Sequence, residues 1–124
     1  MDKYYKNIKQ LIENNLIEAK KYEISANYHT LITYHNIGKE IVEAQGGKRA
    51  GYGDGLIKEY ALNLSSLYGK NYNFSTLKRM RQFYLLFPKG AAMRHQLNWT
   101  ILKVLLPIKD ESKRNCYINS ITIF

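Results

Sequence analysis

Acidic residues are absent from a long stretch of this chain, because neither aspartate nor glutamate occurs between Tyr60 and Lys109. Basic residues are frequent in the same stretch: Lys70, Lys78, Arg79, Arg81, Lys89, Arg94, Lys103 and Lys109. A segment that carries only positive charge attracts polyanions, and phosphate backbones in particular. Nucleic-acid binding is therefore the first hypothesis that the sequence supports.

Cysteine and long apolar runs are also scarce. Cys116 is the only cysteine among the 124 residues, which excludes an internal disulfide or a multi-cysteine metal site within them and is typical of a reducing compartment. No apolar run reaches the roughly 20 residues that span a bilayer, and the first residues lack the apolar core of a secretion signal. We expect a cytoplasmic protein with no membrane partner.

The positive charge is confined to one part of the chain. Residues 1–46 contain six lysines and six acidic residues, so the net charge of +9 arises from residues 47–124, where 13 basic residues face four acidic ones. The hydrophobic share of 45% predicts a globular protein. A surface charged only for solubility is the alternative explanation.

Proline is limited to Pro88 and Pro107, and no segment alternates apolar and polar residues for long, so the chain is predicted to be all-α. We predict one small helical domain over residues 1–124. It would contain a long helical segment at 1–45, a helix-turn-helix-like unit at 54–88 and C-terminal helices at 97–124. The first segment is either one helix or two, with the break expected within residues 22–28.

The central unit has recognisable helix signals. Asp54 fits the N-cap of a helix that ends at Tyr68, and Gly69 fits a left-handed position after it. Ser75 is expected to cap the next helix, which Pro88 ends.

On a helical wheel, this second helix has one apolar and one basic face. Its apolar face, expected to pack inward, holds Leu77, Met80, Phe83, Tyr84 and Phe87. Lys78, Arg79 and Gln82 lie opposite, with Arg81 and Thr76 near the edges. A short turn before such a helix matches the helix-turn-helix arrangement.

The C-terminal residues predict two more helices. Residues 97–107 read as a short, largely buried helix, and Asp110 is expected to cap a last helix that runs to about residue 121. In that helix Lys113 and Arg114 should point outward, whereas Tyr117 and Ile121 should point inward.

Several sequence blocks resemble the N-terminal domain of the bacterial YhcG-like family. They are Tyr34-His-Asn-Ile-Gly-Lys-Glu-Ile-Val, Gly46-Gly-Lys-Arg-Ala-Gly-Tyr-Gly-Asp-Gly-Leu-Ile-Lys-Glu, Phe74-Ser-Thr-Leu-Lys-Arg-Met-Arg-Gln-Phe-Tyr-Leu-Leu-Phe-Pro88, Leu97-Asn-Trp-Thr and Lys109-Asp-Glu-Ser-Lys-Arg-Asn-Cys-Tyr. The resemblance implies a helical DNA-binding or interaction module that full-length members join to a C-terminal nuclease domain of the PD-(D/E)xK type. The family usually has Trp-Glu where this chain has His35-Asn36, and Ser-His where it has Thr100-Ile101.

No catalytic or metal site is expected within these residues. A nuclease of that type needs an acid and a Glu-x-Lys on adjacent strands to hold Mg²⁺. The tripeptides Glu18-Ala-Lys20 and Glu111-Ser-Lys113 match only by chance, because both fall in helical segments. His29, His35 and His95 lack metal-ligand spacing and are interpreted as ordinary surface or half-buried residues, and no cofactor is expected.

The sequence therefore favours a non-catalytic DNA-binding domain that resembles the N-terminal module of a YhcG-like nuclease. The predicted nucleic-acid contacts have two roles. Those expected to face the groove, where Arg and Gln can pair with guanine and adenine, are Thr76, Lys78, Arg79 and Gln82, and those expected to hold phosphates are Arg81, Lys48, Arg49, Lys70 and Lys89, with Ser75 at the helix start as a further phosphate neighbour. Among the loop tyrosines, Tyr52 and Tyr72 are the better candidates for stacking on bases. The rival hypothesis is a protein-interaction module that forms a homodimer or assembles a nuclease complex, which the charge-balanced N-terminal segment favours.

Overall fold

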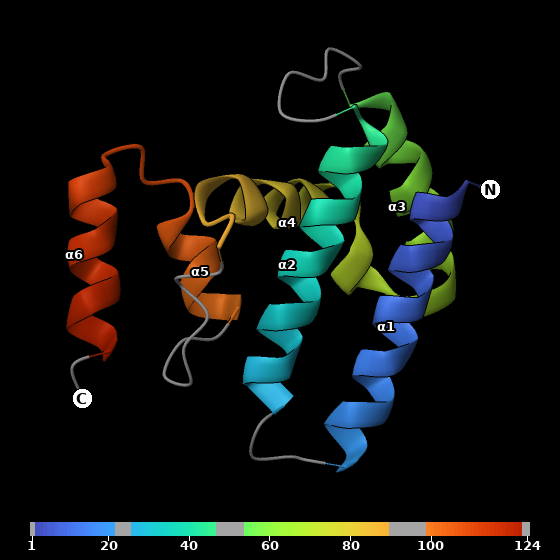
Figure 1. Cartoon of the computed structure of the whole chain (residues 1–124), viewed down its shortest axis with the longest axis horizontal. Helices are drawn as coiled ribbons and strands as arrows, with labels where there is room; N and C mark the ends of the chain where they lie inside the picture. The colour runs from blue at the N-terminus through green and yellow to red at the C-terminus, as the bar shows by residue number, and fades with distance from the viewer. Residues whose placement is uncertain (1, 22–25, 47–53, 90–98, 123–124) are drawn as a thin grey trace.

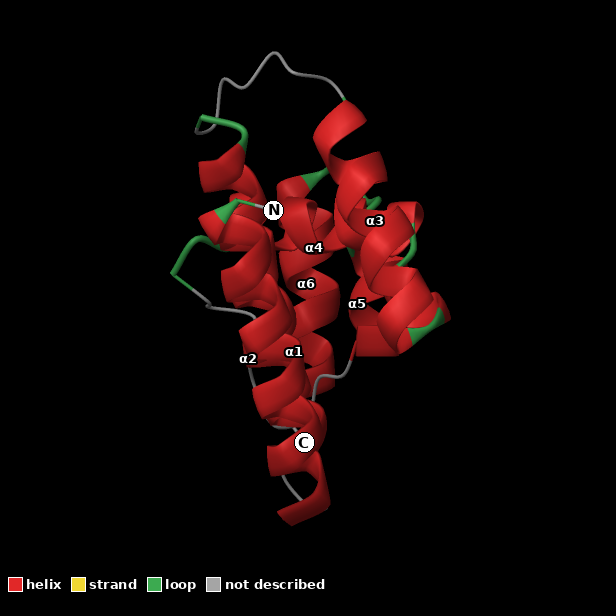
Figure 2. Cartoon of the chain, turned by 90° about the vertical axis from the view of Figure 1, so that its right-hand side faces the viewer, coloured by secondary structure: helices red, strands yellow, loops and turns green. Residues whose placement is uncertain are grey.

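The computed structural model describes residues 2–21, 26–46, 54–89 and 99–122 (Figure 1). Within these ranges it contains helices and no strand, so the predicted all-α class is confirmed (Figure 2). The α-helices are α1 (Lys3–Lys21), α2 (Ala26–Ala44), α3 (Gly55–Tyr68), α4 (Phe74–Leu86), α5 (Trp99–Leu105) and α6 (Glu111–Thr122), and a 3₁₀ turn, η2 (Lys70–Tyr72), follows α3. The N-terminal segment is thus two helices. No described helix is long and apolar enough to cross a membrane.

α1 and α2 run side by side in opposite directions, and α4 crosses behind α2 (Figure 1). Their shared core contains Ile8 and Ile12 of α1, Ile37 and Ile41 of α2 and Met80 of α4, each with less than 1% of its surface exposed. Burying such side chains contributes about 1.5–3 kcal/mol each. This packing fixes the direction in which α4 runs.

Gly38 makes the crossing of α2 and α4 possible. A Cβ atom at this position would overlap the backbone carbonyl of Met80 and lie 3.0 Å from the Tyr84 Cβ. Glycine inside a helix costs about 1 kcal/mol relative to alanine, and here that cost is offset by backbone-to-backbone contact between two helices. The sequence showed Gly38 as the one glycine inside the first segment but did not reveal this role.

Two tyrosines of α3 tie that helix to carboxylates just before α1 and within it. The Tyr60 hydroxyl donates to both carboxylate oxygens of Asp2 at 2.8 Å, and the Tyr68 hydroxyl donates to Glu13 Oε1 at 2.9 Å. Burial and the hydrogen bond to Glu13 raise the pKa of Tyr68 to about 12. Asp2 also accepts a bond from the Tyr5 backbone N–H, at 2.8 Å, at the start of α1. The sequence alone does not reveal these acceptors.

A second core forms on the other side of α4. It contains Leu31 of α2, Phe83 of α4, Leu102 and Leu105 of α5, and Leu106, which follows α5. α4 therefore contributes to both cores, with Leu77 and Met80 in one and Phe83 in the other. This leaves one side of α4 for other contacts.

His35 is buried beside this second core, whereas it was expected at the surface or half-buried. Only 6% of its surface is exposed, its Nε2 lies 2.6 Å from the Phe87 carbonyl oxygen, and its ring packs edge-on against Phe83 and Tyr84. A carbonyl can only accept, so Nε2 carries the hydrogen. The bond satisfies a carbonyl at the end of α4. His29 is half-buried, and His95 lies outside the described residues.

The prediction for α6 was right about the cap and wrong about two side chains. Asp110 caps the helix, because its Oδ1 accepts from the Lys113 N–H at 3.1 Å. Arg114, expected outward, is 5% exposed and donates to the Ile108 carbonyl, while Tyr117, expected inward, is 45% exposed. The Arg114 guanidinium lies over the Phe87 ring, which explains how a charged side chain packs inward. The side chain of Ile121 lies outside those described.

Candidate nucleic-acid interface on α4

α4 begins at a cap two residues earlier than expected. Asn73, not Ser75, is the N-cap, and its Oδ1 accepts from the Thr76 backbone N–H and the Thr76 hydroxyl, both at 2.9 Å. The 3₁₀ turn before it uses residues 70–72, so the chain enters the helix at Phe74 and Ser75 already lies in the first turn. Ser75 is consequently exposed, with its hydroxyl not used as the cap.

An open hollow of about 410 Å³ lies on the side of α4 that faces away from the first core. It is lined by Ser75, Lys78, Arg79, Arg81 and Gln82, and we call it the α4 hollow. These are five of the ten residues predicted to contact nucleic acid. Among the described residues, its lining contains three cationic side chains and no carboxylate, so its potential favours an anion.

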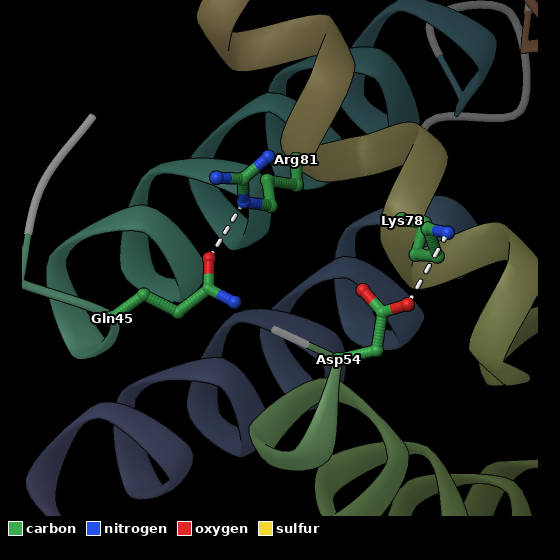
Figure 3. A network of polar contacts seen from close by, with 4 residues as sticks. All are labelled: Gln45, Asp54, Lys78 and Arg81. Atoms are coloured by element: carbon green, nitrogen blue, oxygen red, sulfur yellow. Dashed lines mark hydrogen bonds and ion pairs between the residues drawn. The ribbon is translucent and has the colours of Figure 1, made fainter. Parts of the chain in front are cut away.

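Lys78 has an acidic partner at the edge of this surface. Its Nζ lies 3.6 Å from Asp54 Oδ2, and both side chains are about half exposed (Figure 3). Asp54 stands at the N-cap position of α3 but makes no side-chain cap bond, and its carboxylate pairs with Lys78 instead. An exposed pair of this kind contributes at most about 1 kcal/mol and is weakened by salt.

A further lysine, which sequence reasoning missed, contacts the same aromatic ring as Lys78. The Nζ of Lys58 on α3 is 5.5 Å from the centre of the Phe74 ring, and the Nζ of Lys78 is 5.1 Å from the same centre. Two cations of two helices thus share one aromatic ring. The spacing of Lys58 and Lys78 in sequence gives no sign of this shared contact, because the contact depends on how the η2 turn brings α3 and α4 together.

Arg81 is anchored to the end of α2. Its Nε donates to Gln45 Oε1 at 2.6 Å, and Gln45 is 2% exposed (Figure 3). In Figure 3 the two terminal nitrogens of Arg81 lie on the side of the guanidinium away from Gln45. The side chain therefore has a defined position while keeping its terminal donors available.

Gln82 is anchored to the residue that follows α5. Its amide Nε2 donates to the Leu106 carbonyl at 3.0 Å, and the side chain is half-buried. Because only the amide nitrogen can donate to a carbonyl, this bond fixes which way the amide points. Gln82 is thus half-buried against α5, although the wheel placed it on the face opposite the core.

The other predicted contacts lie apart from the hollow or outside the described residues. Thr76 uses its hydroxyl in the Asn73 cap, and Lys70 and Lys89 are exposed beyond opposite ends of α4. At 1.5 Å per residue the 13-residue helix is roughly 20 Å long, so these two lysines would serve different phosphates. Lys48 and Arg49, like Tyr52, lie outside the described residues.

Tyr72 is not available for stacking on bases. It is 6% exposed and packs edge-on against Tyr34 and Tyr68 in the first core. The sequence placed it in a polar connection, but the connection is a 3₁₀ turn that points this ring inward.

The two Glu-x-Lys tripeptides lie in helices, as predicted: residues 18–20 in α1 and residues 111–113 in α6. In the part of the chain that the structure describes, no three His, Cys, Asp or Glu side chains are grouped so that they could hold a metal ion.

Fold and surface together define a small all-helical domain with a basic face on one central helix. The chain belongs to the family described as DUF1016 N-terminal domain, whose family model matches residues 7–123. It is also 38% identical over 77 residues to a protein of Escherichia coli (strain K12) named "Putative nuclease YhcG". That match covers 59% of this chain and 20% of the relative, so the chain spans only a small part of the relative's length. No solved structure matches the chain.

These comparisons confirm the resemblance to the N-terminal domain of the YhcG-like family. The word nuclease belongs to the relative's name, and four-fifths of that protein lies outside the match.

Proposed function

We propose that this chain is a DNA-binding domain that acts without catalysis and places the α4 hollow against the DNA backbone. The observation that carries the proposal is the grouping of Lys78, Arg79 and Arg81 in one hollow, whose lining includes no carboxylate in the part of the chain that the structure describes. The acid-free stretch of sequence places further lysines around it, among them Lys70 and Lys89, which are both exposed. Such a surface attracts phosphate groups and accelerates encounter with them.

The arrangement of α3, η2 and α4 supports the same proposal. In a helix-turn-helix the second helix lies against DNA while the first packs across it. Here α3 packs on α4, and α4 is held by both cores, so its basic face is presented by a rigid element. Rigid placement lowers the entropy that binding must overcome.

The relative named as a nuclease suggests what such binding achieves. In longer proteins of this family, a DNA-binding N-terminal domain would hold a nuclease domain on its substrate. The tethered domain would then meet DNA at a high effective concentration.

The proposal is tested by comparing two double variants of equal charge. Lys78→Ala with Arg79→Ala removes two cations from the hollow, whereas Lys6→Ala with Lys39→Ala removes two exposed cations from α1 and α2. We expect the first to weaken DNA binding about tenfold to a hundredfold at about 50 mM salt, and the second to change it much less. Fluorescence anisotropy with labelled duplex and single-stranded DNA measures both. Equal losses in the two variants, or no binding by the unaltered protein, would refute the proposal.

One observation favours a second candidate, a protein-interaction module. Leu16 and Ile17 on α1 are 50% and 53% exposed, within the charge-balanced segment of the chain. Their exposure leaves apolar surface for a partner, and DNA-binding domains often dimerise to reach two half-sites. Light scattering over a wide concentration range tests self-association, and a strict monomer throughout would remove the homodimer.

A further inference from the structure

We infer that the α4 hollow binds a phosphate group of the DNA backbone rather than base edges, and that buried Gln45 positions Arg81 for this contact. The inference rests on the proposed function, because DNA supplies the phosphate. Its consequence is that DNA binding by this chain depends little on sequence.

Arg81 is built into the protein as a fixed guanidinium. Its Nε–H is bound to Gln45 Oε1 at 2.6 Å, and Gln45 is 2% exposed at the end of α2, so the acceptor itself cannot swing into solvent. The remaining donors of the guanidinium fork match two oxygens of one phosphate group. Holding the fork in place before DNA arrives reduces the conformational freedom lost on binding.

Gln82 is unsuited to reading bases in this structure. Recognition of adenine by glutamine uses the amide nitrogen and oxygen together, but the Gln82 nitrogen already donates to the Leu106 carbonyl at 3.0 Å. Turning it toward a base would leave a buried carbonyl without its donor, which is unfavourable. Gln82 therefore forms a wall of the hollow.

The shape and chemistry of the hollow agree with a projecting phosphate. Base edges lie inside a groove and are reached by side chains that protrude, whereas a phosphate protrudes from the duplex and fits a concave site. Lys78, Arg79, Arg81 and the Ser75 hydroxyl supply donors around the hollow, and phosphate oxygens accept from all of them. Contacts of this kind position a protein on DNA without reading its sequence.

Sequence dependence is tested with duplexes of one length and AT-rich, GC-rich and mixed sequence, and by selection from a random-sequence pool, at a single salt concentration. We expect affinities within about tenfold of one another and no enriched motif, since sequence-specific proteins prefer their sites by about a thousandfold or more. A preference above that tenfold limit, or an enriched motif, would overturn the inference and leave the proposed function standing. Absence of binding to duplex and single-stranded DNA alike would overturn both.

The role of Gln45 is tested by a double-mutant cycle. Gln45→Met keeps the volume and removes the acceptor, and should weaken DNA binding about fivefold, but only while Arg81 is present. An equal loss in the Arg81→Ala background would mean that Gln45 acts through the fold and not through Arg81.

Arg81→Lys provides an independent test that leaves Gln45 unaltered. Lysine keeps the charge but lacks the guanidinium fork, so affinity should fall about fivefold to tenfold while the salt dependence of binding stays the same. Binding by Arg81→Lys equal to that of the unaltered protein would overturn the positioning role.

Discussion

Lys78 shows, at the scale of single residues, how one side chain can make contacts within the protein and also line the proposed phosphate site. It touches the Phe74 ring and pairs with Asp54, yet it also lines the α4 hollow. Its ion pair is exposed and therefore weak, so a phosphate can compete with the carboxylate. Asp54 is the acid that limits the positive potential at this edge.

Asp54→Asn should therefore tighten DNA binding. Removing this carboxylate releases Lys78 and deletes a repulsive charge, and we expect a gain of about twofold to fivefold at low salt, with stability changed by less than about 1 kcal/mol. Anisotropy titrations measure the gain. Glu111→Gln changes the net charge equally at an exposed position on α6, so similar gains from both variants would contradict a local effect.

Single residues also mark how far sequence reasoning reaches. The wheel assigned Leu77, Met80 and Phe83 of α4 to the interior, and all three have less than 1% of their surface exposed. It could not show that the donors of Arg81 and Gln82 bond to Gln45 and Leu106, because those partners lie 36 and 24 residues away along the chain. Arg114 was missed because its partners, the Phe87 ring and the Ile108 carbonyl, depend on tertiary packing.

At the scale of elements, the helices could be predicted better than their ends. The sequence Asn73-Phe-Ser-Thr offers two residues that cap well, Asn73 and Ser75, and only the 3₁₀ turn before them decides which one is used. Similarly, Gly69 was expected to have a positive φ and has one, at 95°. Its ψ of −171°, however, lies outside the left-handed helical region, because the chain continues into η2.

Substitutions at the two candidate caps separate them. Asn73→Ala should lower the free energy of unfolding by about 1 kcal/mol, because it removes the acceptor of the Thr76 N–H. Ser75→Ala should change it by less than about 0.5 kcal/mol. Urea denaturation followed by circular dichroism measures both values. A larger cost for Ser75→Ala than for Asn73→Ala would contradict the assignment.

The junction of α1 and α3 predicts a pH dependence. Burial alone would raise the pKa of the Asp2 carboxyl, but hydrogen bonds from the Tyr5 N–H and the Tyr60 hydroxyl together outweigh it and lower that pKa. The folded state thus binds this proton less readily than the unfolded state, so the stabilisation is present above the ordinary Asp pKa of about 3.9 and is lost as pH falls through the lower folded value.

Thermal unfolding of the unaltered protein and of Asp2→Asn tests this sign. The difference in melting temperature should be largest near neutral pH and should shrink as pH falls below about 4. A difference that grows on acidification would show that Asp2 does not stabilise the fold as a carboxylate.

At the scale of the whole molecule, α4 connects structure to the proposed function. It packs into the core shared by α1, α2 and α3 and into the core shared with α5, and it carries the basic hollow on its remaining side. The charge is also unevenly divided along the chain. Residues 1–46 have no net charge, and the whole net charge of +9 lies in residues 47–124. The sequence revealed this division directly, because charge needs no tertiary information to be counted.

The salt dependence of DNA affinity tests the central claim most directly. For a protein that neutralises phosphates, the logarithm of the binding constant falls linearly with the logarithm of salt concentration, by about 0.9 for each phosphate on duplex DNA. The unaltered protein should show such a fall, and Lys78→Ala with Arg79→Ala should make it shallower by about 1.8, whereas Lys6→Ala with Lys39→Ala should leave it unchanged. Affinity that does not depend on salt would contradict the account. A slope that changes only in the variant with Lys6→Ala and Lys39→Ala would contradict it as well.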